Sequence, residues 1–211
     1  MKKVKNIIFD LGGVLLNLAP QLTDQAFTAL AGGKVNYDKI QNKLGNSFFD
    51  TYEIGKSSSD FFSTTLCTSL NATPKQVCSA WNAMLLDMPM ERIELLKNLK
   101  KEGYTIYLLS NTNAIHLEGF SAILDEVYGF DNFSNLFEKA YYSHLIHLRK
   151  PNEEIYEYVC KDAGIEPSET IFVDDNTDNI QGAKNVGLHG ILHPRNGNIK
   201  STIYEALDMI Q

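Results

Sequence analysis

Short apolar runs alternate with helical segments along much of this chain, and that alternation constrains the fold more than any other feature. Runs with the composition of β-strands occupy residues 4–10, 104–109, 139–142, 170–173 and 188–192. Segments with helical signals lie directly before the second, fourth and fifth runs, at residues 91–101, 152–163 and 179–186. Strands that are separated by helices join through right-handed crossovers and pair in parallel. The sequence therefore predicts an α/β fold built on a parallel sheet.

The segment between the first and second runs has a different period. From residue 17 to residue 88, apolar residues recur at the spacing of amphipathic helices. A Thr-Pro pair at residues 73–74 has the residue types of a helix N-cap and its first helical position. We therefore expect three to five helices over residues 17–88, inserted into one core domain of residues 1–16 and 89–211.

Composition narrows the class of partner. The 211 residues are 44% hydrophobic and 21% charged, which is enough to bury a core, and the net charge is −7. A negative chain whose basic residues do not cluster beyond three lysines near the N-terminus is a poor match for nucleic acid. No apolar stretch approaches the roughly 18 residues of a bilayer span, and the N-terminus runs directly into a strand, leaving no room for a cleavable signal. We expect a cytoplasmic protein that binds neither nucleic acid nor membrane; its oligomeric state is left open.

Polar residues stand where these apolar runs end. Asp10 closes the first run, Ser110 closes the second, and the pair Asp174 and Asp175 follows the fourth, while Lys150 precedes a proline. Each alone has an ordinary explanation, such as an aspartate in a turn, a helix cap or a solvated lysine. The carboxyl ends of parallel strands, however, meet at the edge where α/β proteins bind ligands. We therefore interpret these positions as one candidate site.

These side chains match the needs of phosphoryl transfer. A phosphate ester resists attack because its oxygens are negative, so an enzyme needs a positioned nucleophile with positive charge and hydrogen-bond donors around it. Asp10 is the candidate nucleophile and would form an aspartyl-phosphate that water hydrolyses. Ser110 and the amide of Asn111 would donate to the phosphoryl oxygens, and Lys150 would add a fixed positive charge.

Charge balance predicts a metal ion at the same edge. Asp10, Asp174 and Asp175 would raise one another's proton affinity if they met without a cation. Mg²⁺ prefers oxygen ligands and is usually held by one or two carboxylates, waters and the substrate phosphate. We expect these carboxylates to hold Mg²⁺ as the cofactor.

Four ordered motifs carry a family resemblance. They are Ile-Ile-Phe-Asp-Leu-Gly-Gly-Val-Leu at residues 7–15, Leu-Ser-Asn-Thr-Asn at 109–113, Arg-Lys-Pro at 149–151 and Val-Asp-Asp-Asn at 173–176. In order, spacing and residue type they resemble the motifs of the haloacid dehalogenase-like hydrolases. The resemblance implies a Rossmann-like parallel sheet core, Mg²⁺ dependence, an aspartyl-phosphate mechanism and an inserted α-helical bundle cap. The strings at 108–116 and 149–156 look most like a bacterial subgroup of sugar-phosphate phosphatases, such as those that act on glucose 1-phosphate.

The first motif departs from the family pattern. The family usually has a second aspartate two residues after the nucleophile, which protonates the leaving group and activates water, whereas this chain has Gly12. The resemblance implies that the backbone carbonyl of Gly12 still binds the metal. Loss of a general acid typically lowers a rate by about 10²–10⁴-fold. Gly12 therefore favours anomeric sugar phosphates or acyl phosphates, whose leaving groups depart with little proton donation, or else a slow enzyme or a protein that only binds.

The fourth motif departs as well, because Asn179 stands where an acid is common in the family. By the family pattern we expect Asp175 to bind the metal directly and Asp174 to act through water. Asn179 is expected to orient a water or Lys150.

Specificity is expected to come from the cap, because the core recognises only the phosphoryl group. Trp81 and His116 are candidates for contact with the substrate, beside Gly13 and Asn111 in the first two motifs. The alternative for Trp81 is burial in the cap, since aromatic residues at helical spacing more often belong to a core.

Three functions compete for this sequence. The leading hypothesis is a Mg²⁺-dependent phosphatase that acts on a small phosphorylated metabolite such as a sugar phosphate. A 2-haloacid dehalogenase shares the nucleophilic aspartate but works without metal, so the pair Asp174 and Asp175 argues against it. A non-catalytic binding module is favoured by Gly12 and opposed by the retention of the other site residues.

Overall fold

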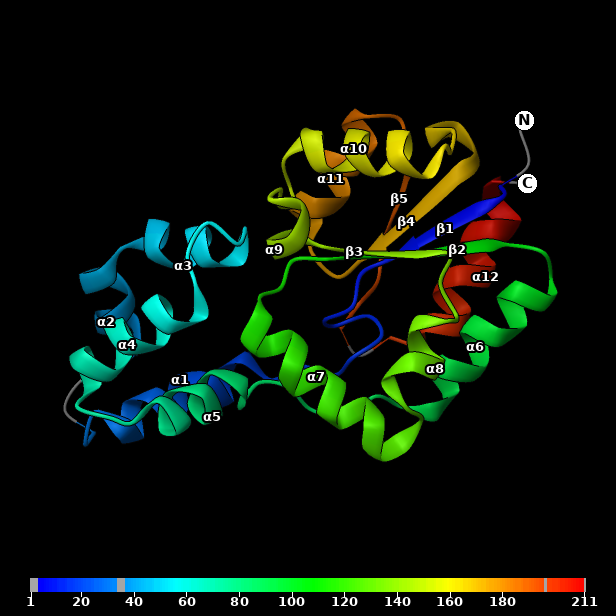
Figure 1. The fold of residues 1–211 in the computed structure, drawn as a ribbon. Coiled ribbons are helices and arrows are strands. Elements are labelled where there is room, and N and C mark those ends of the chain that lie inside the picture. Colours follow the sequence, from blue (N-terminus) through cyan, green and yellow to red (C-terminus); the bar gives the residue numbers. More distant parts are fainter. Residues whose placement is uncertain (1–3, 34–36, 196, 211) are drawn as a thin grey trace.

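The computed structural model describes residues 4–33, 37–195 and 197–210. Within these ranges, five parallel strands form one sheet in the order β3-β2-β1-β4-β5 (Figure 1). The strands are β1 (Asn6–Phe9), β2 (Thr105–Ser110), β3 (Lys139–Tyr142), β4 (Thr170–Asp174) and β5 (His189–Leu192). Every predicted strand overlaps an observed one. The predicted α/β fold with a Rossmann-like parallel sheet and an inserted helical cap is confirmed.

Helices cover both faces of the sheet, as parallel strands buried on both sides require. One face packs against the helices α6 (Met90–Lys101), α7 (Ala114–Val127), α8 (Phe130–Ser134) and α12 (Ile199–Ile210). The other face packs against α10 (Glu153–Ala163) and α11 (Thr177–Asn185). The short elements α9 (Ser143–Ile146) and η1 (Pro167–Glu169) lie in the connections before β4. Figure 1 shows the two helical layers on opposite sides of the strands.

Five helices of the described chain form a separate bundle between β1 and α6, beside the sheet (Figure 1). They are α1 (Pro20–Leu30), α2 (Tyr37–Leu44), α3 (Asn46–Glu53), α4 (Ser59–Leu70) and α5 (Pro74–Asn82). The bundle has its own apolar cluster, in which Phe62 stacks on Tyr52 with ring centroids 4.0 Å apart. The expected N-cap at Thr73 is present as a capping box with Gln76. We call this bundle the cap, and its boundaries at residues 17 and 88 remain a proposal.

Two connecting segments join the cap to the core, and they are hydrogen-bonded to each other. The amide of Asn17 donates to the carbonyl of Asp87 at 3.0 Å, and the amide of Ala19 donates to the carbonyl of Met84 at 2.9 Å. The Asn17 side chain also donates to Asp87 Oδ1 at 2.9 Å. The insertion therefore leaves and re-enters the core at one place, which fixes the cap over the carboxyl edge of the sheet.

The helices α7, α8, α9 and α12 were not predicted. Helix α7 begins at the N-cap Asn113, whose side chain accepts from the amide of His116. It packs against both the sheet and the cap helix α5, so apolar residues lie on more than one of its faces and blur the helical period.

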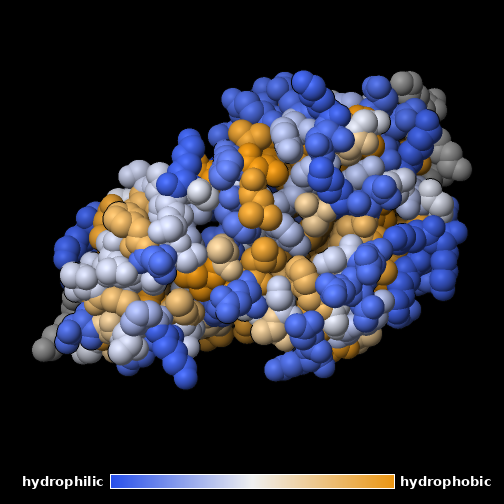
Figure 2. All heavy atoms as spheres, viewed as in Figure 1, coloured by the Kyte–Doolittle hydropathy of each residue, from blue (hydrophilic) through white to orange (hydrophobic). Residues whose placement is uncertain are grey.

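On the face shown in Figure 2, hydrophilic side chains cover most of the periphery and hydrophobic ones gather near the middle. In the ranges that the structure describes, no helix combines the length and the hydrophobicity needed to cross a bilayer.

Candidate active site

The candidate site lies at the carboxyl edge of the sheet, between the neighbouring strands β1 and β4. Asp10 follows β1 directly, and Asp174 is the last residue of β4. The amide of Asp10 donates to the carbonyl of Val173 at 2.9 Å, which continues the pairing of the two strands to this point. The chain runs outward from β1 to β2 and β3 on one side and continues as β4 and β5 on the other. Ligands bind at such a switch point in open α/β sheets.

Lys150 joins the two strands through its buried ammonium group. Its Nζ donates to Asp10 Oδ1 at 2.8 Å, to Asp174 Oδ2 at 2.7 Å and to the carbonyl of Leu109 at 3.0 Å. These three bonds use all three ammonium hydrogens, and the residue is 1% exposed. In this structure the single charge of Lys150 is therefore shared between the two aspartates, and its ammonium has no hydrogen left for a phosphoryl group.

The charges of this cluster shift its pKa values. Burial raises the pKa of Asp10 to about 7, against the lowering effect of the Lys150 ammonium, and the negative charge of Asp174 adds to the rise. Burial alone would lower the pKa of Lys150, but its two carboxylate partners outweigh burial and leave that pKa raised. Lys150 is thus positively charged. Asp10 needs a further positive charge to stay ionised at neutral pH.

Three carboxylates meet at this edge in an arrangement that suits a hard cation. Asp10, Asp174 and Asp175 each offer one oxygen, and the three oxygens lie within 4.8 Å of one another. Mg²⁺ takes oxygen ligands at about 2.0–2.1 Å in an octahedron, so ligand oxygens less than about 4.2 Å apart can share one ion. The donor set therefore fits Mg²⁺ after small side-chain movements, and it fits Zn²⁺ poorly because neither histidine nor cysteine belongs to it.

Asp174 and Asp175 have different surroundings. The carboxylate of Asp174 is fully buried and accepts from Lys150, from the amide of Asn176 at 2.8 Å and from Asn179 Nδ2, which lies 3.0 Å from both oxygens. Asp175 is partly exposed and accepts at Oδ2 from Arg195 Nε at 3.0 Å. Asn179 thus contacts Asp174, which in turn accepts from Lys150, and the expected contact of Asn179 with a water remains a prediction.

The two glycines of the first motif lie against this cluster. Gly13 has φ +77°, and a Cβ atom there would lie 2.4 Å from Asp175 Oδ2, so only glycine allows this approach. Gly12 lines the cavity described below, and a Cβ atom there would lie 2.5 Å from the side-chain tip of Leu18. The expected roles of Gly12 in metal binding and of Gly13 in substrate binding remain predictions.

Two hydrogen bonds join the side chain of Asn111, in the second motif, to the main chain of Lys150. Asn111 Nδ2 donates to the carbonyl of Lys150 at 2.9 Å, and the amide of Lys150 donates to Asn111 Oδ1 at 2.9 Å. These two bonds fix the orientation of the Asn111 carboxamide and use one of its two N–H donors, and its main-chain amide is a further donor for a ligand. The nearest acceptor of Ser110 Oγ is the carbonyl of Asn111 at 3.5 Å, a marginal distance, so the hydroxyl can turn toward the cavity.

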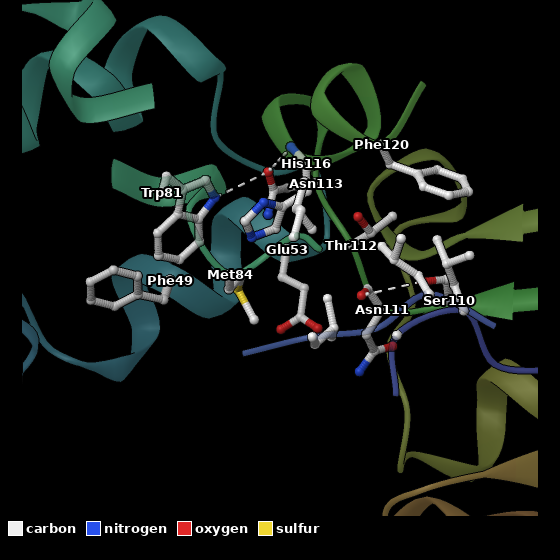
Figure 3. A pocket seen from close by; sticks show the side chains of 15 residues that line it. Phe49, Glu53, Trp81, Met84, Ser110, Asn111, Thr112, Asn113, His116 and Phe120 are labelled. Carbon is white, nitrogen blue, oxygen red and sulfur yellow. Dashed lines mark hydrogen bonds between the residues drawn. The ribbon is translucent and has the colours of Figure 1, made fainter. Parts of the chain in front are cut away.

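A cavity of about 260 Å³ lies between the cap and the second motif (Figure 3). Its lining includes Gly12, Ser110 and Asn111 from the core, with Phe49 and Trp81 from the cap. Figure 3 shows the two aromatic side chains on one side and Ser110 and Asn111 on the other. Most of the lining is apolar, which is typical of small-molecule sites.

Trp81 and His116 line this cavity as a stacked pair. Their ring centroids are 4.9 Å apart with planes inclined by 6°. Trp81 Nε1 donates to Asn113 Oδ1 at 3.3 Å, and His116 Nδ1 lies 2.9 Å from Asn82 Oδ1. Burial lowers the pKa of His116 to about 4, so its ring is neutral at physiological pH. Through these contacts the two side chains connect the cap to α7. Their contact with substrate remains a prediction.

One cavity residue, Glu53, was missed from the sequence. It is the last residue of α3, and in Figure 3 it stands between Trp81 and Asn111. Its Oε2 pairs with Arg149 Nη2 at 3.0 Å. The available signal was its place in the sequence, next to Tyr52 in a helix that is rich in aromatic residues. Without the fold, nothing distinguished Glu53 from a surface glutamate.

The fold and the edge geometry together define a class of protein. It comprises α/β proteins with an acidic site at the switch point of a parallel sheet and an inserted helical cap above that site. The chain belongs to the haloacid dehalogenase-like hydrolase family, whose model matches residues 4–187. It is therefore a hydrolase, as the four motifs predicted.

Two curated relatives and one solved structure show which members this chain is similar to. It is 31% identical to D-ribitol-5-phosphate phosphatase of Bacteroides thetaiotaomicron, over 92% of this chain and 93% of the relative. It is 28% identical to a sesquiterpene phosphatase of Aspergillus oryzae, over 89% of this chain and 88% of the relative. A HAD family enzyme of Bacteroides thetaiotaomicron, solved in complex with magnesium and inorganic phosphate, superposes with a TM-score of 0.80 at 31% identity and covers 92% of this chain and 96% of that chain.

Proposed function

We propose that this protein is a Mg²⁺-dependent phosphatase that hydrolyses a small phosphorylated metabolite through an aspartyl-phosphate on Asp10. The observation that carries the proposal is the buried cluster at the sheet edge, where Asp10, Asp174 and Asp175 offer oxygens within 4.8 Å of one another beside the Lys150 ammonium. Two curated phosphatases and a magnesium and phosphate complex among the similar proteins support it.

Each residue of the site has a separate role in the proposed reaction. Asp10 attacks phosphorus with its carboxylate oxygen, and the bond to the leaving oxygen breaks as the new one forms. Lys150 keeps Asp10 oriented through the bond to Oδ1, so that Oδ2 is the oxygen available for attack. Asp10, Asp175 and the carbonyl of Gly12 would hold Mg²⁺, with Asp174 acting through water. The ion supplies positive charge to the phosphoryl oxygens when it is bound.

The substrate class we propose is a phosphorylated sugar or sugar alcohol. The phosphoryl group would lie against Ser110 Oγ and the amide of Asn111, with Gly13 beside it, and the organic part would extend into the cavity toward Trp81 and His116. A cavity of about 260 Å³ suits a molecule of this size. Its enclosure between core and cap would exclude bulk water from the ester.

Hydrolysis of 4-nitrophenyl phosphate by the purified protein tests the proposal. Turnover is expected with Mg²⁺, and its loss is expected with a chelator or in Asp10→Asn. Asp178→Asn is the matched control, because Asp178 is an exposed acid in the first turn of α11, outside the cluster. Turnover that survives in Asp10→Asn, or metal-independent chloride release from a 2-haloacid, would contradict the proposal. A screen of sugar, polyol and acyl phosphates then identifies the substrate.

A further inference from the structure

Position 12 of the first motif has no side chain that can move a proton, yet a carboxylic acid from the cap lines the same cavity. Gly12 and Glu53 both line this cavity, and Ser110 and Asn111, which flank the phosphoryl position, line it as well. Glu53 comes from α3, far from the first motif in the sequence. In Figure 3 it is the acidic side chain among those labelled.

Several contacts hold the end of α3 on the core. Ser143 Oγ lies 2.7 Å from the carbonyl of Glu53, and His147 Nδ1 lies 2.8 Å from the carbonyl of Ile54. The backbone then passes so close to the core at Gly55, which has φ +67°, that a Cβ atom there would lie 2.0 Å from the carbonyl of His144. The position of Glu53 over the second motif is therefore fixed by backbone contacts and not by the side chain alone.

The charges around Glu53 suit a group that cycles between acid and carboxylate. Burial raises its pKa, the Arg149 guanidinium opposes that rise, Asp50 adds to it, and Lys150 is a weaker opposing charge. Arg149 occupies Oε2 at 3.0 Å, and no partner for Oε1 is found among the described residues. Oε1 is thus the atom that can face a ligand, while Arg149 stabilises the carboxylate after its proton has left.

We propose, on the basis of the phosphatase function above, that Glu53 supplies the proton that the missing side chain at position 12 would otherwise transfer. As Asp10 bonds to phosphorus and the ester P–O bond breaks, Glu53 gives its proton to the leaving oxygen, and the alcohol departs. The Glu53 carboxylate then takes a proton from the water that attacks the aspartyl-phosphate. This second step frees phosphate and restores both Asp10 and protonated Glu53.

This assignment changes the expected substrate range. Gly12 alone favours esters whose leaving group departs without a proton. With Glu53 as the proton donor, esters of ordinary alcohols become substrates too, because their alkoxides need protonation as the P–O bond breaks. The relative named for D-ribitol 5-phosphate is named for an ester of this kind.

Two aromatic phosphates of similar size test the proposal. The leaving group of 4-nitrophenyl phosphate needs no proton, whereas that of benzyl phosphate does. In single turnovers with Mg²⁺ and excess enzyme, Glu53→Gln is expected to slow alcohol release from benzyl phosphate by about 10²–10⁴-fold and to slow nitrophenol release far less. Wild-type cleavage of benzyl phosphate is expected to fall as pH rises and deprotonates Glu53, and this fall should be absent in Glu53→Gln.

The matched control is Asp50→Asn. Asp50 lies on the same helix and pairs with the same arginine at 2.8 Å, but it does not line the cavity. Because the Asp50 charge raises the pKa of Glu53, the comparison is made at a pH low enough to protonate Glu53 in both proteins, where Asp50→Asn should keep the wild-type ratio between the two esters. Equal losses for both esters in Glu53→Gln, or a loss confined to KM, would overturn the proposal, provided that thermal melting shows the variant folded. Absence of Mg²⁺-dependent turnover in the wild type would instead overturn the proposed function.

Discussion

Replacement of Lys150 by methionine probes the electrostatics on which the site depends. The change keeps a side chain of similar length but removes a buried charge and three hydrogen bonds, two of them to carboxylates at 2.8 and 2.7 Å. Asp10 and Asp174 are then left buried and unpaired by any cation. Breaking a buried ion pair by removing one partner costs about 3–5 kcal/mol, and we expect this loss in the free energy of unfolding of the metal-free protein at pH 8.

Urea unfolding with and without Mg²⁺ measures the effect. Added Mg²⁺ is expected to recover part of the loss, because the cation neutralises the same carboxylates and binds only the folded protein. At lower pH the loss should shrink, because the ammonium lowers the pKa of Asp10 and this buried carboxyl takes up a proton more readily once the ammonium is gone. Lys139→Met is the control: Lys139 makes a single ion pair with Asp162 at 2.6 Å on the surface, and its removal should leave stability almost unchanged.

A loss below about 1 kcal/mol for Lys150→Met in metal-free protein would refute this reasoning. It would mean that the two aspartates are already protonated or hydrated in the folded state. A loss as large as expected but insensitive to both pH and Mg²⁺ would point to lost packing instead of lost charge.

Three further predictions follow from single positions. His116 has a pKa of about 4 in the folded protein and about 6.5 in the unfolded chain, so the unfolded chain binds the proton first as pH falls. The free energy of unfolding should therefore decrease, by at most about 3 kcal/mol, as pH drops from about 6.5 to about 4. An NMR titration of the ring near pH 6.5 in the folded protein would contradict this. Gly12→Asp in the Glu53→Gln background should restore cleavage of benzyl phosphate, and no gain in a folded double variant would count against proton transfer as the missing function. Gly13→Ala should weaken Mg²⁺ binding in calorimetry, because its Cβ would lie 2.4 Å from Asp175 Oδ2; unchanged affinity would show that the acid can move without loss.

Local sequence signals were enough to predict the sheet and the acidic edge. Each strand is a short apolar run, and parallel strands end at the same edge of a sheet. Asp10, Ser110 and Asp174, which stand at the ends of three such runs, could therefore be grouped from the sequence alone. The cap was equally visible, since a change of period from strand to helix marks it. The N-cap at Thr73 was predicted from two adjacent residue types, and the structure adds its capping box with Gln76.

Contacts between distant segments could not be predicted in the same way. Nothing in the strings around Asn111 and Lys150 reveals that the asparagine carboxamide binds the lysine backbone, because the two lie 39 residues apart. The glutamate at position 53 enters the cavity only through the docking of α3 on the core. Helix α7 was hidden because it is buried on both the cap and the core side.

The buried hydroxyl of Ser143 has a consequence for motion between the lobes. It accepts from the amide of Thr112 at 2.8 Å and lies 2.8 Å from the carbonyl of Thr112 and 2.7 Å from that of Glu53. A hydroxyl has one hydrogen, so it satisfies only one of these carbonyls at a time. Because the hydroxyl can give its hydrogen to Thr112 alone, it would stay hydrogen-bonded to the core if α3 moved away. Such a movement would still break the contacts of Ile54 with His147 and of Asp50 and Glu53 with Arg149, so the hydroxyl lowers only one part of its cost.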